Sequence, residues 1–313
     1  MAYSQRVYRT LAMANSRGVM KAYGCQSMVG TLNRAMVKRP QESYIDDGRI
    51  DAQWEALAYL GRPDLGQAIE EHRRFVILLE AAGVEVDCLP ADDKTGLDSM
   101  YTHDPVASVT DQGVILSHMG KEARMEEVQA IADVFEQQGI PISGRIAPPG
   151  MIEGGDVVWL NKRLVTVGLS YRTNGEGIRQ FQGFMKPLEV EVIAVPMVHW
   201  DGPGAVLHLM SIISMLDKDL AIVYDRLLPI PFRELLLALG IKTVPVPDEE
   251  YDSLGCNVLA VGPRHCLIRS GNSLTVQRMR DAGCRVEEFD GDNICYKGSG
   301  GPTCLTRPVL RQG

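Results

Sequence analysis

Hydrophobic and polar positions along the chain change period in a regular way. From Leu65 the apolar residues fall on one face of a helix, which Gly83 ends, and residues 84–89 then alternate as a half-buried strand. Further along, two strand-like runs around a turn are followed by a helix, and this order recurs. The predicted helix starts recur at intervals of roughly 45 to 55 residues, near Leu65, Glu122, Asn174, Pro231 and Ser273.

Five units of strand, strand, helix and strand predict a repeat architecture arranged around an axis. Loops at one end of such a ring would converge on its centre, where a ligand would sit. The alternative is an ordinary α/β protein whose elements alternate by chance. Residues 46–61 are expected to form a polar connection. Residues 1–30 show little periodicity and are predicted to be an irregular leader, before a single catalytic domain over 31–313.

Composition narrows the functional classes. The chain has 313 residues, of which 45% are hydrophobic and 23% charged, as in ordinary globular proteins. Its formal net charge of −8 argues against non-specific nucleic-acid binding and is compatible with a cationic small substrate. No stretch of about 18 apolar residues is present. A cytoplasmic protein without a membrane partner is therefore expected.

The cysteines indicate where chemistry could occur. They are seven in number and irregularly spaced, and no Cys-x-x-Cys occurs, which argues against a disulfide framework or a structural zinc site. Cys304 differs from the rest because it ends the glycine-rich run 298–304. A loop that brings backbone N–H groups near a sulfur can lower its pKa and stabilise developing charge. We expect Cys304 to be a nucleophile; the alternative is a buried thiol of the core.

A nucleophilic thiolate needs a group that handles protons, and His208 is the best candidate among six histidines. It lies within an apolar run, 205–210, where a lone histidine is more often a core residue. His199, beside Trp200 and Asp201, is the competing candidate.

Carboxylates and an arginine complete the set of candidates. Glu153 and Asp156, separated by two glycines, could face inward as acceptors for a cation or could form a polar hairpin turn. Asp104 stands before a proline, where aspartate is often a turn former. Arg172 could bind an anion, or its segment could simply begin a helix with Asn174 as the N-cap. No phosphate-binding loop, His-Glu-x-x-His or Gly-x-Ser-x-Gly motif occurs, so the cysteine constellation is the only complete one.

Taken together and in this order, these motifs resemble the guanidine-modifying, or pentein, superfamily, and within it most closely the dimethylarginine dimethylaminohydrolases. The likeness runs from about residue 31 to the C-terminus, and the Leu-Ser-x-Arg-Thr-Asn motif is its most specific part. The resemblance implies an α/β fold, a five-bladed propeller of ββαβ units, in agreement with the five repeats. The matching segments are 97–105, 152–156, 168–174, 207–209 and 300–305.

The resemblance also implies roles for individual residues. Cys304 would attack a guanidinium carbon, while Glu153 and Asp104 would hold the guanidinium N–H groups through charge-assisted hydrogen bonds. His208 would protonate the departing amine and then deprotonate the water that releases the product from a covalent thiouronium intermediate. The implied activity is hydrolysis of an N-ω-methylated arginine to citrulline and an alkylamine, without a cofactor or metal.

Further positions match the pocket of this family. Arg124 and Arg172 would bind the carboxylate of the amino acid, and Asp98 and Tyr101 would line the pocket. A homodimer is also implied.

Three departures bear on the substrate. Met210 replaces an aspartate that arginine deiminases and amidinotransferases usually carry, which favours the dimethylarginine hydrolases. The loop 300–304 looks more like the cysteine loop of the deiminases, and His103 stands where an acidic residue is common. Arginine deimination or amidino transfer therefore remains an alternative, as does a non-catalytic pentein that binds ligands or partners.

Overall fold

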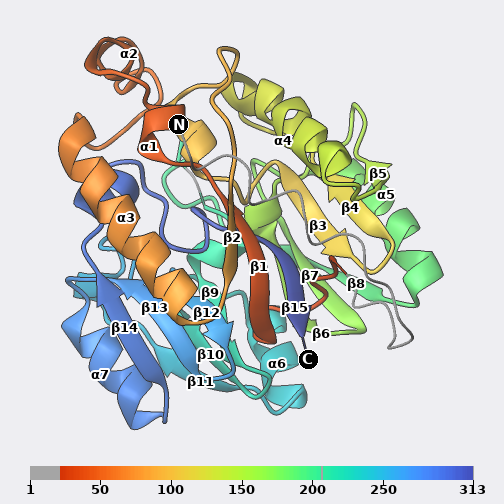
Figure 1. Cartoon of the computed structure of the whole chain (residues 1–313). Coiled ribbons are helices and arrows are strands. Elements are labelled where there is room, and N and C mark those ends of the chain that lie inside the picture. Colours follow the sequence, from red (N-terminus) through yellow and green to blue (C-terminus); the bar gives the residue numbers. More distant parts are fainter. Residues whose placement is uncertain (1–21, 206, 313) are drawn as a thin grey trace, which may run out of the picture.

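Five three-stranded sheets surround a common centre, with the long helices on the outside (Figure 1). This arrangement comes from a computed structural model, which describes residues 22–205 and 207–312. Sheets and helices repeat in the order predicted from the hydrophobic pattern, so the expectation of a five-bladed ring is confirmed. Most of the predicted leader, residues 1–21, lies outside the described residues.

Four of the units follow one another along the chain and share one topology. In each, the first two strands are antiparallel, and a helix then returns the chain to a third strand parallel to the second. Their elements are β3 (Val106–Thr110), β4 (Gly113–Leu116), α4 (Met125–Gln137) and β5 (Ile142–Arg145); β6 (Val157–Asn161), β7 (Leu164–Leu169), α5 (Gly175–Met185) and β8 (Glu191–Pro196); β9 (Ile213–Asp217), β10 (Leu220–Val223), α6 (Ile230–Ala238) and β11 (Lys242–Pro245); β12 (Leu259–Gly262), β13 (His265–Arg269), α7 (Ser273–Asp281) and β14 (Arg285–Phe289).

The fifth unit joins the two ends of the described chain. Its own segment supplies β1 (Thr31–Val37), α3 (Leu65–Ala81) and β2 (Glu85–Cys88), and the missing strand is β15 (Arg307–Gln312). β15 pairs antiparallel with β1, so the order β15-β1-β2 repeats the pattern of the other sheets. This pairing closes the ring.

Two short helices precede α3, namely α1 (Pro40–Ser43) and α2 (Asp47–Gln53). The expectation of a polar connection over 46–61 was therefore wrong for its first part. Asp46 is the N-cap of α2, where its side chain accepts a hydrogen bond from the Arg49 N–H. Aspartate favours both helix N-caps and turns, so composition alone did not distinguish a short polar helix from a polar connection.

The ends of the long helices follow the local sequence signals. Gly83 after α3 and Gly139 after α4 have φ of 86° and 71°, the left-handed conformation in which a residue without a Cβ ends a helix at low cost. Asn174, the predicted N-cap of α5, accepts a hydrogen bond of 2.8 Å from the Gly177 N–H.

Each long helix buries one large apolar side chain against its sheet, so the core repeats with the units. These residues are Phe75, Phe135, Phe181, Phe232 and Met279. The innermost strands β3, β6, β9, β12 and β15 instead surround a central cavity. Among the described residues, no helix combines the length and the apolar character needed to cross a bilayer.

Candidate active site

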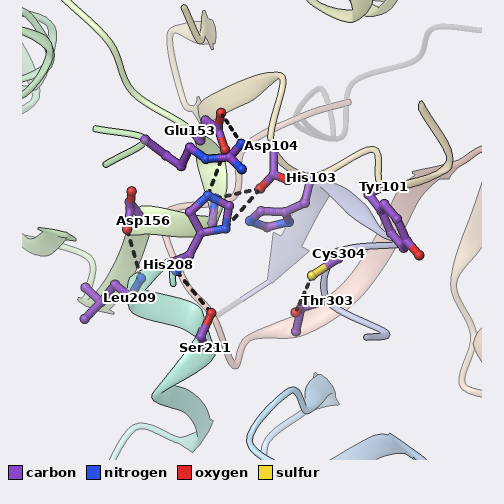
Figure 2. Close-up of polar contacts among 12 residues, drawn as sticks. Tyr101, His103, Asp104, Glu153, Asp156, His208, Leu209, Ser211, Thr303 and Cys304 are labelled. Atoms are coloured by element: carbon purple, nitrogen blue, oxygen red, sulfur yellow. Dashed lines mark hydrogen bonds and ion pairs between the residues drawn. The ribbon is translucent and has the colours of Figure 1, made fainter. Parts of the chain in front are cut away.

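Each of the five units contributes a polar residue to one end of the ring, from the segment that leads into its innermost strand. Because equivalent positions in a ring of repeats lie around the same axis, residues far apart in the sequence meet there. The five residues are Asp104 before β3, Glu153 before β6, His208 before β9, Asn257 before β12 and Cys304 before β15. Figure 2 shows all of them except Asn257 around one space.

His208 lies between two buried carboxylates (Figure 2). Its Nε2 atom is 2.8 Å from Oε2 of Glu153, and its Nδ1 atom is 4.0 Å from Oδ1 of Asp104. Burial lowers the pKa of the imidazole, but the charge of Asp104 and the hydrogen bond with Glu153 outweigh it and raise the pKa to about 9. His208 is therefore an imidazolium at neutral pH.

Glu153 is held as an anion by its surroundings. Its Oε1 accepts hydrogen bonds from the backbone N–H groups of Gly120 at 2.9 Å and Lys121 at 3.0 Å, while Nη1 of Arg172 lies 3.5 Å away. Burial raises the pKa of Glu153. The hydrogen bond with His208 and the charge of the imidazolium lower it by more, so the net shift is downward. An ionised, fully buried carboxylate thus lies beside the imidazolium of His208.

Asp156, the second carboxylate of the Glu-Gly-Gly-Asp run, has a different role from the one expected. Its Oδ1 accepts from the backbone N–H of Leu209 at 2.9 Å, and its Oδ2 accepts from the hydroxyl of Ser170 at 2.6 Å. Because both oxygens bind protein groups, Asp156 fixes the segment that carries His208 and does not face a ligand. Of the two interpretations of Asp156, these contacts favour the structural one.

Asp104 is fixed from two sides. Gly155 donates its backbone N–H to Oδ1 at 3.0 Å, and Nη1 of Arg124 lies 2.6 Å from Oδ2. Burial alone would raise the pKa of Asp104, but the positive charges of His208 and Arg124 lower it well below its usual range. The backbone N–H of His103 donates to the carbonyl of Cys304 at 3.2 Å, which ties this segment to the cysteine loop.

Cys304 is half-buried at the edge of the same space (Figure 2). The side-chain amide of Asn257 donates to its sulfur at 3.2 Å, and Oδ1 of Asn257 accepts from the backbone N–H and the hydroxyl of Thr303 at 3.1 and 2.6 Å. Burial and the negative charge of Asp104 raise the pKa of the thiol, against the hydrogen bonds from Asn257 and the Gly301 backbone. At neutral pH the free site therefore holds a thiol and an imidazolium.

The glycine loop before Cys304 is required by close packing. A Cβ on Gly301 would overlap the side chain of Asn257, and one on Gly300 would lie 2.6 Å from the ring of Tyr101. The predicted close approach of this backbone to a partner is confirmed. The partners are the side chains that flank the nucleophile.

Arg124 is placed differently from the expected carboxylate ligand. It is buried, and its nitrogens donate to Asp104, to the carboxylate of Glu127 and to the carbonyl of Tyr101 at 2.8 Å. These contacts engage Nε and both terminal nitrogens, so the guanidinium positions Asp104 and has no nitrogen left free of a protein partner. Burial raises the pKa of Glu127 to about 7, despite its contact with Arg124.

The remaining predicted pocket residues lie around the site. Oδ2 of Asp98 lies 2.6 Å from Nζ of Lys121, a contact that sequence reasoning missed. Tyr101 is buried against the cysteine loop, and its hydroxyl has no hydrogen-bond partner among the described residues. Arg172 is buried beside Glu153. The competing histidine, His199, is instead exposed, and its ring pairs with the hydroxyl of Tyr171.

Asp104, Glu153 and His208 also present donor atoms within 4.8 Å of one another, a spacing compatible with a metal ion. The hydrogen bond between His208 and Glu153 and the contact of Arg124 with Asp104 already use these atoms. These atoms thus already have protein partners, and the prediction that no metal is needed stays a prediction.

Solved structures define the class to which this ring belongs. It superimposes on dimethylarginine dimethylaminohydrolase from Pseudomonas aeruginosa with a TM-score of 0.73 and 23% identity, covering 90% of this chain and 100% of the other. An amidinotransferase from Microseira wollei gives a TM-score of 0.74 with 16% identity, covering 93% and 98% of the two chains. The fold is therefore the pentein propeller, as predicted.

Sequence comparison is more specific. The family model for N,N dimethylarginine dimethylhydrolase, eukaryotic, matches residues 62–311. The dimethylarginine dimethylaminohydrolase of Pseudomonas aeruginosa is 27% identical over 250 residues, which cover 80% of this chain and 91% of the relative. The chain belongs to the dimethylarginine dimethylaminohydrolase family, a family of hydrolases that act on guanidino compounds.

Proposed function

We propose that the protein hydrolyses an N-ω-methylated arginine to citrulline and an alkylamine through a covalent intermediate on Cys304. One observation carries this proposal, namely that a thiol, an imidazolium and two ionised carboxylates from four different units surround one space. A guanidinium is a poor electrophile because its charge is delocalised. Dividing its hydrolysis into two thiol-mediated steps lowers each barrier.

Binding would rest on the two carboxylates. Asp104 and Glu153 are buried and ionised, and a guanidinium offers planar N–H donors that suit carboxylate oxygens. The substrate would enter as a cation, and its guanidinium would bind between the carboxylates of Asp104 and Glu153. A neutral urea product lacks this charge, so it would bind less tightly and leave.

The arriving cation would also activate the nucleophile. The thiol of Cys304 has a raised pKa because it is buried and faces the charge of Asp104. A guanidinium beside the sulfur replaces that unfavourable field with a positive one and lowers the pKa of the thiol. The proton of Cys304 would pass to solvent as the substrate binds, while His208 keeps its own proton.

In the first step the thiolate of Cys304 forms a bond to the guanidinium carbon, and the electrons of the C–N π bond move onto nitrogen. His208 then donates its proton to the methylated nitrogen, the C–N bond breaks and the alkylamine leaves. A cationic S-alkylthiouronium remains beside Glu153 and Asp104. Its charge is matched by the same carboxylates that bound the substrate.

In the second step the neutral imidazole of His208 takes a proton from water, and the hydroxide adds to the thiouronium carbon. The C–S bond breaks with its electron pair on sulfur, and the hydroxyl proton is released to solvent as the ureido group of citrulline forms. His208 and Cys304 thereby return to imidazolium and thiolate.

Arg172 is the proposed ligand for the substrate carboxylate, since it lies beside Glu153 and no hydrogen bond from its Nε or Nη2 to another described residue is found. Arg124 would act through Asp104, which it holds in place. Asp98 and Tyr101 would shape the pocket wall on the side of the cysteine loop.

Met210 supports a methylated arginine over arginine itself. It is buried in the apolar core beside β9, so this position offers no third carboxylate to the guanidinium. A site with fewer acceptors suits a guanidinium in which methyl groups replace N–H donors. Removal of ammonia from arginine is the competing reaction.

A product assay on the purified protein tests the proposal. The panel would contain monomethylarginine, asymmetric dimethylarginine, arginine, agmatine and simple alkylguanidines. We expect citrulline with methylamine or dimethylamine from the methylated arginines. Ammonia from arginine as the main product would mean that the protein is an arginine deiminase. Equal turnover of agmatine would remove the role of Arg172, and no turnover of any substrate would favour amidino transfer or a non-catalytic role.

A further inference from the structure

The central cavity of the ring contains two buried arginines that the proposed chemistry does not use. Arg307 and Arg311 both lie on β15, and each is more than nine-tenths buried, with exposures of 6% and 8%. Both line the cavity that the innermost strands surround. No aspartate or glutamate is among the described residues that line it.

Several N–H donors of these arginines have no acceptor among the described residues. Nη1 of Arg307 donates to the carbonyls of His103 and Val106 at 3.2 and 2.8 Å, and Nη1 of Arg311 donates to the carbonyl of Gly30 at 2.7 Å. Arg311 also forms a side-chain hydrogen bond with Cys25. The buried Nε atoms of both arginines have no hydrogen-bond partner in the described part of the chain. A guanidinium carries five donors, so each group keeps donors that these residues do not satisfy.

The groups nearest the arginines do not neutralise them. Burial lowers the pKa of Arg307 to about 10, so it remains a cation at neutral pH. Burial raises the pKa of the Cys25 thiol, although both arginines oppose this, and its sulfur donates to the carbonyl of Ser27 at 3.7 Å. Asp104 acts on Arg307 through its charge, and no hydrogen bond between the two is found among the described residues.

A hydroxyl adds to the unused donors. Oγ of Ser27 accepts from the backbone N–H groups of Val29 at 3.2 Å and Gly30 at 2.9 Å, so its own O–H is left to donate. Ser27 lines the same cavity as the two arginines. Donors and positive charge therefore gather in a cavity whose described lining contains no carboxylate, and buried charges without a charged partner are costly.

We propose that the central cavity binds one small inorganic anion of the halide type between Arg307 and Arg311. A halide accepts hydrogen bonds from any direction and needs donors on only part of its surface. The rest of the cavity wall is mostly apolar, with His103, Ser214 and Thr303 as its other polar residues. Such a wall suits a halide better than an anion whose several oxygens each need a donor. The apolar part of the wall includes Ala107, Val157, Val258, Leu259 and Ala260.

Thermal unfolding in defined salts tests this site independently of turnover. The purified chain would be exchanged into sodium methanesulfonate, and chloride or bromide would replace that anion at constant ionic strength. Binding to the folded state predicts a saturable rise in Tm. At ten times the dissociation constant, the equilibrium constant for unfolding should fall about 11-fold. Equal Tm in all salts would overturn the proposal.

Variants locate the effect in the cavity. Arg307→Leu and Arg311→Leu should each remove the halide dependence of Tm, while Arg163→Leu should keep it, because Arg163 is an exposed arginine paired with Glu189. Halide dependence that survives in both cavity variants would place the ion elsewhere and overturn the site.

Crystals of the unaltered chain grown in bromide give a test that does not depend on a variant folding. An anomalous difference peak between the two guanidinium groups is expected. A fully occupied bromide elsewhere, with none in the cavity, would contradict the proposal.

Discussion

The two layers of the ring's centre carry opposite imbalances of charge. At the end where the innermost strands begin, the carboxylates of Glu153 and Asp104 flank the single imidazolium of His208. Between the same strands, Arg307 and Arg311 face a cavity without a carboxylate among the described residues. The net charge of −8 describes neither layer. β15 supplies both arginines of the cavity, whereas the site residues come from the segments that precede the five inner strands, so different residues set the charge of each layer.

Removing the nucleophile is the largest expected change at the carboxylate-rich end. Cys304→Ser should abolish turnover, because a serine hydroxyl with only an imidazolium beside it is not ionised at neutral pH. The measurement is citrulline release, with Tm recorded to show that the fold is kept. Cys88→Ser is the matched control, since Cys88 is exposed on β2 and should retain full activity. Turnover by Cys304→Ser would refute the covalent mechanism.

The repeats were predictable because their signals are local. Helix starts near Leu65, Asn174 and Ser273 follow from periodicity and caps, and each concerns residues that contact one another within a few turns. The pairing of β1 with β15 was not predicted, since it joins the two ends of the described chain. Only the closed ring shows that the fifth unit needs this strand.

Sequence motifs predicted that Cys304, His208 and Glu153 share one site, and the structure brings them together, while their chemical roles stay predictions. The site was not predictable where a side chain acts on another. Arg124 was expected to bind a ligand but is held by Glu127, a pairing that the spacing i, i+3 allows without requiring. Asn257 was missed, although its place before β12 repeats the places of the other site residues, and aligning the five units would have found it.

Neutralising one carboxylate should produce the next largest effect. Glu153→Gln removes a charge that faces the guanidinium and the imidazolium. We expect a loss of about 2–4 kcal/mol of transition-state stabilisation, which lowers kcat/KM roughly 30- to 1,000-fold. The measurement is steady-state kinetics with the best substrate. Glu287→Gln is the control, because Glu287 also contacts a histidine, His265 at 2.5 Å, but lies on the outer strand β14. An unchanged rate for Glu153→Gln would mean that this segment has only a structural role.

Acidity should change the rate in a direction that follows from the two raised pKa values. The reacting form needs the Cys304 thiolate, which is gained as pH rises, and the His208 imidazolium, which is lost as pH rises through about 9. Below pH 9 the fraction in this form should grow about tenfold per pH unit, so kcat/KM should rise from pH 6 toward 9 and then fall. The measurement is a pH profile of kcat/KM. A maximum near pH 6 would contradict the assigned proton positions.

The smallest effect concerns the hydrogen bond to the sulfur. The side-chain amide of Asn257 donates to the sulfur of Cys304 at 3.2 Å, and this hydrogen bond lowers the pKa of the thiol by stabilising the thiolate. Asn257→Ala removes the donor. A bond of this kind contributes about 1 kcal/mol, so kcat/KM at neutral pH should fall by up to about tenfold. The same variant should shift the pH dependence of Cys304 alkylation by iodoacetamide to higher pH, which a purely structural loss would not do. An unshifted alkylation profile would mean that Asn257 only supports Thr303 and the cysteine loop, and that burial and Asp104 alone set the pKa of the nucleophile.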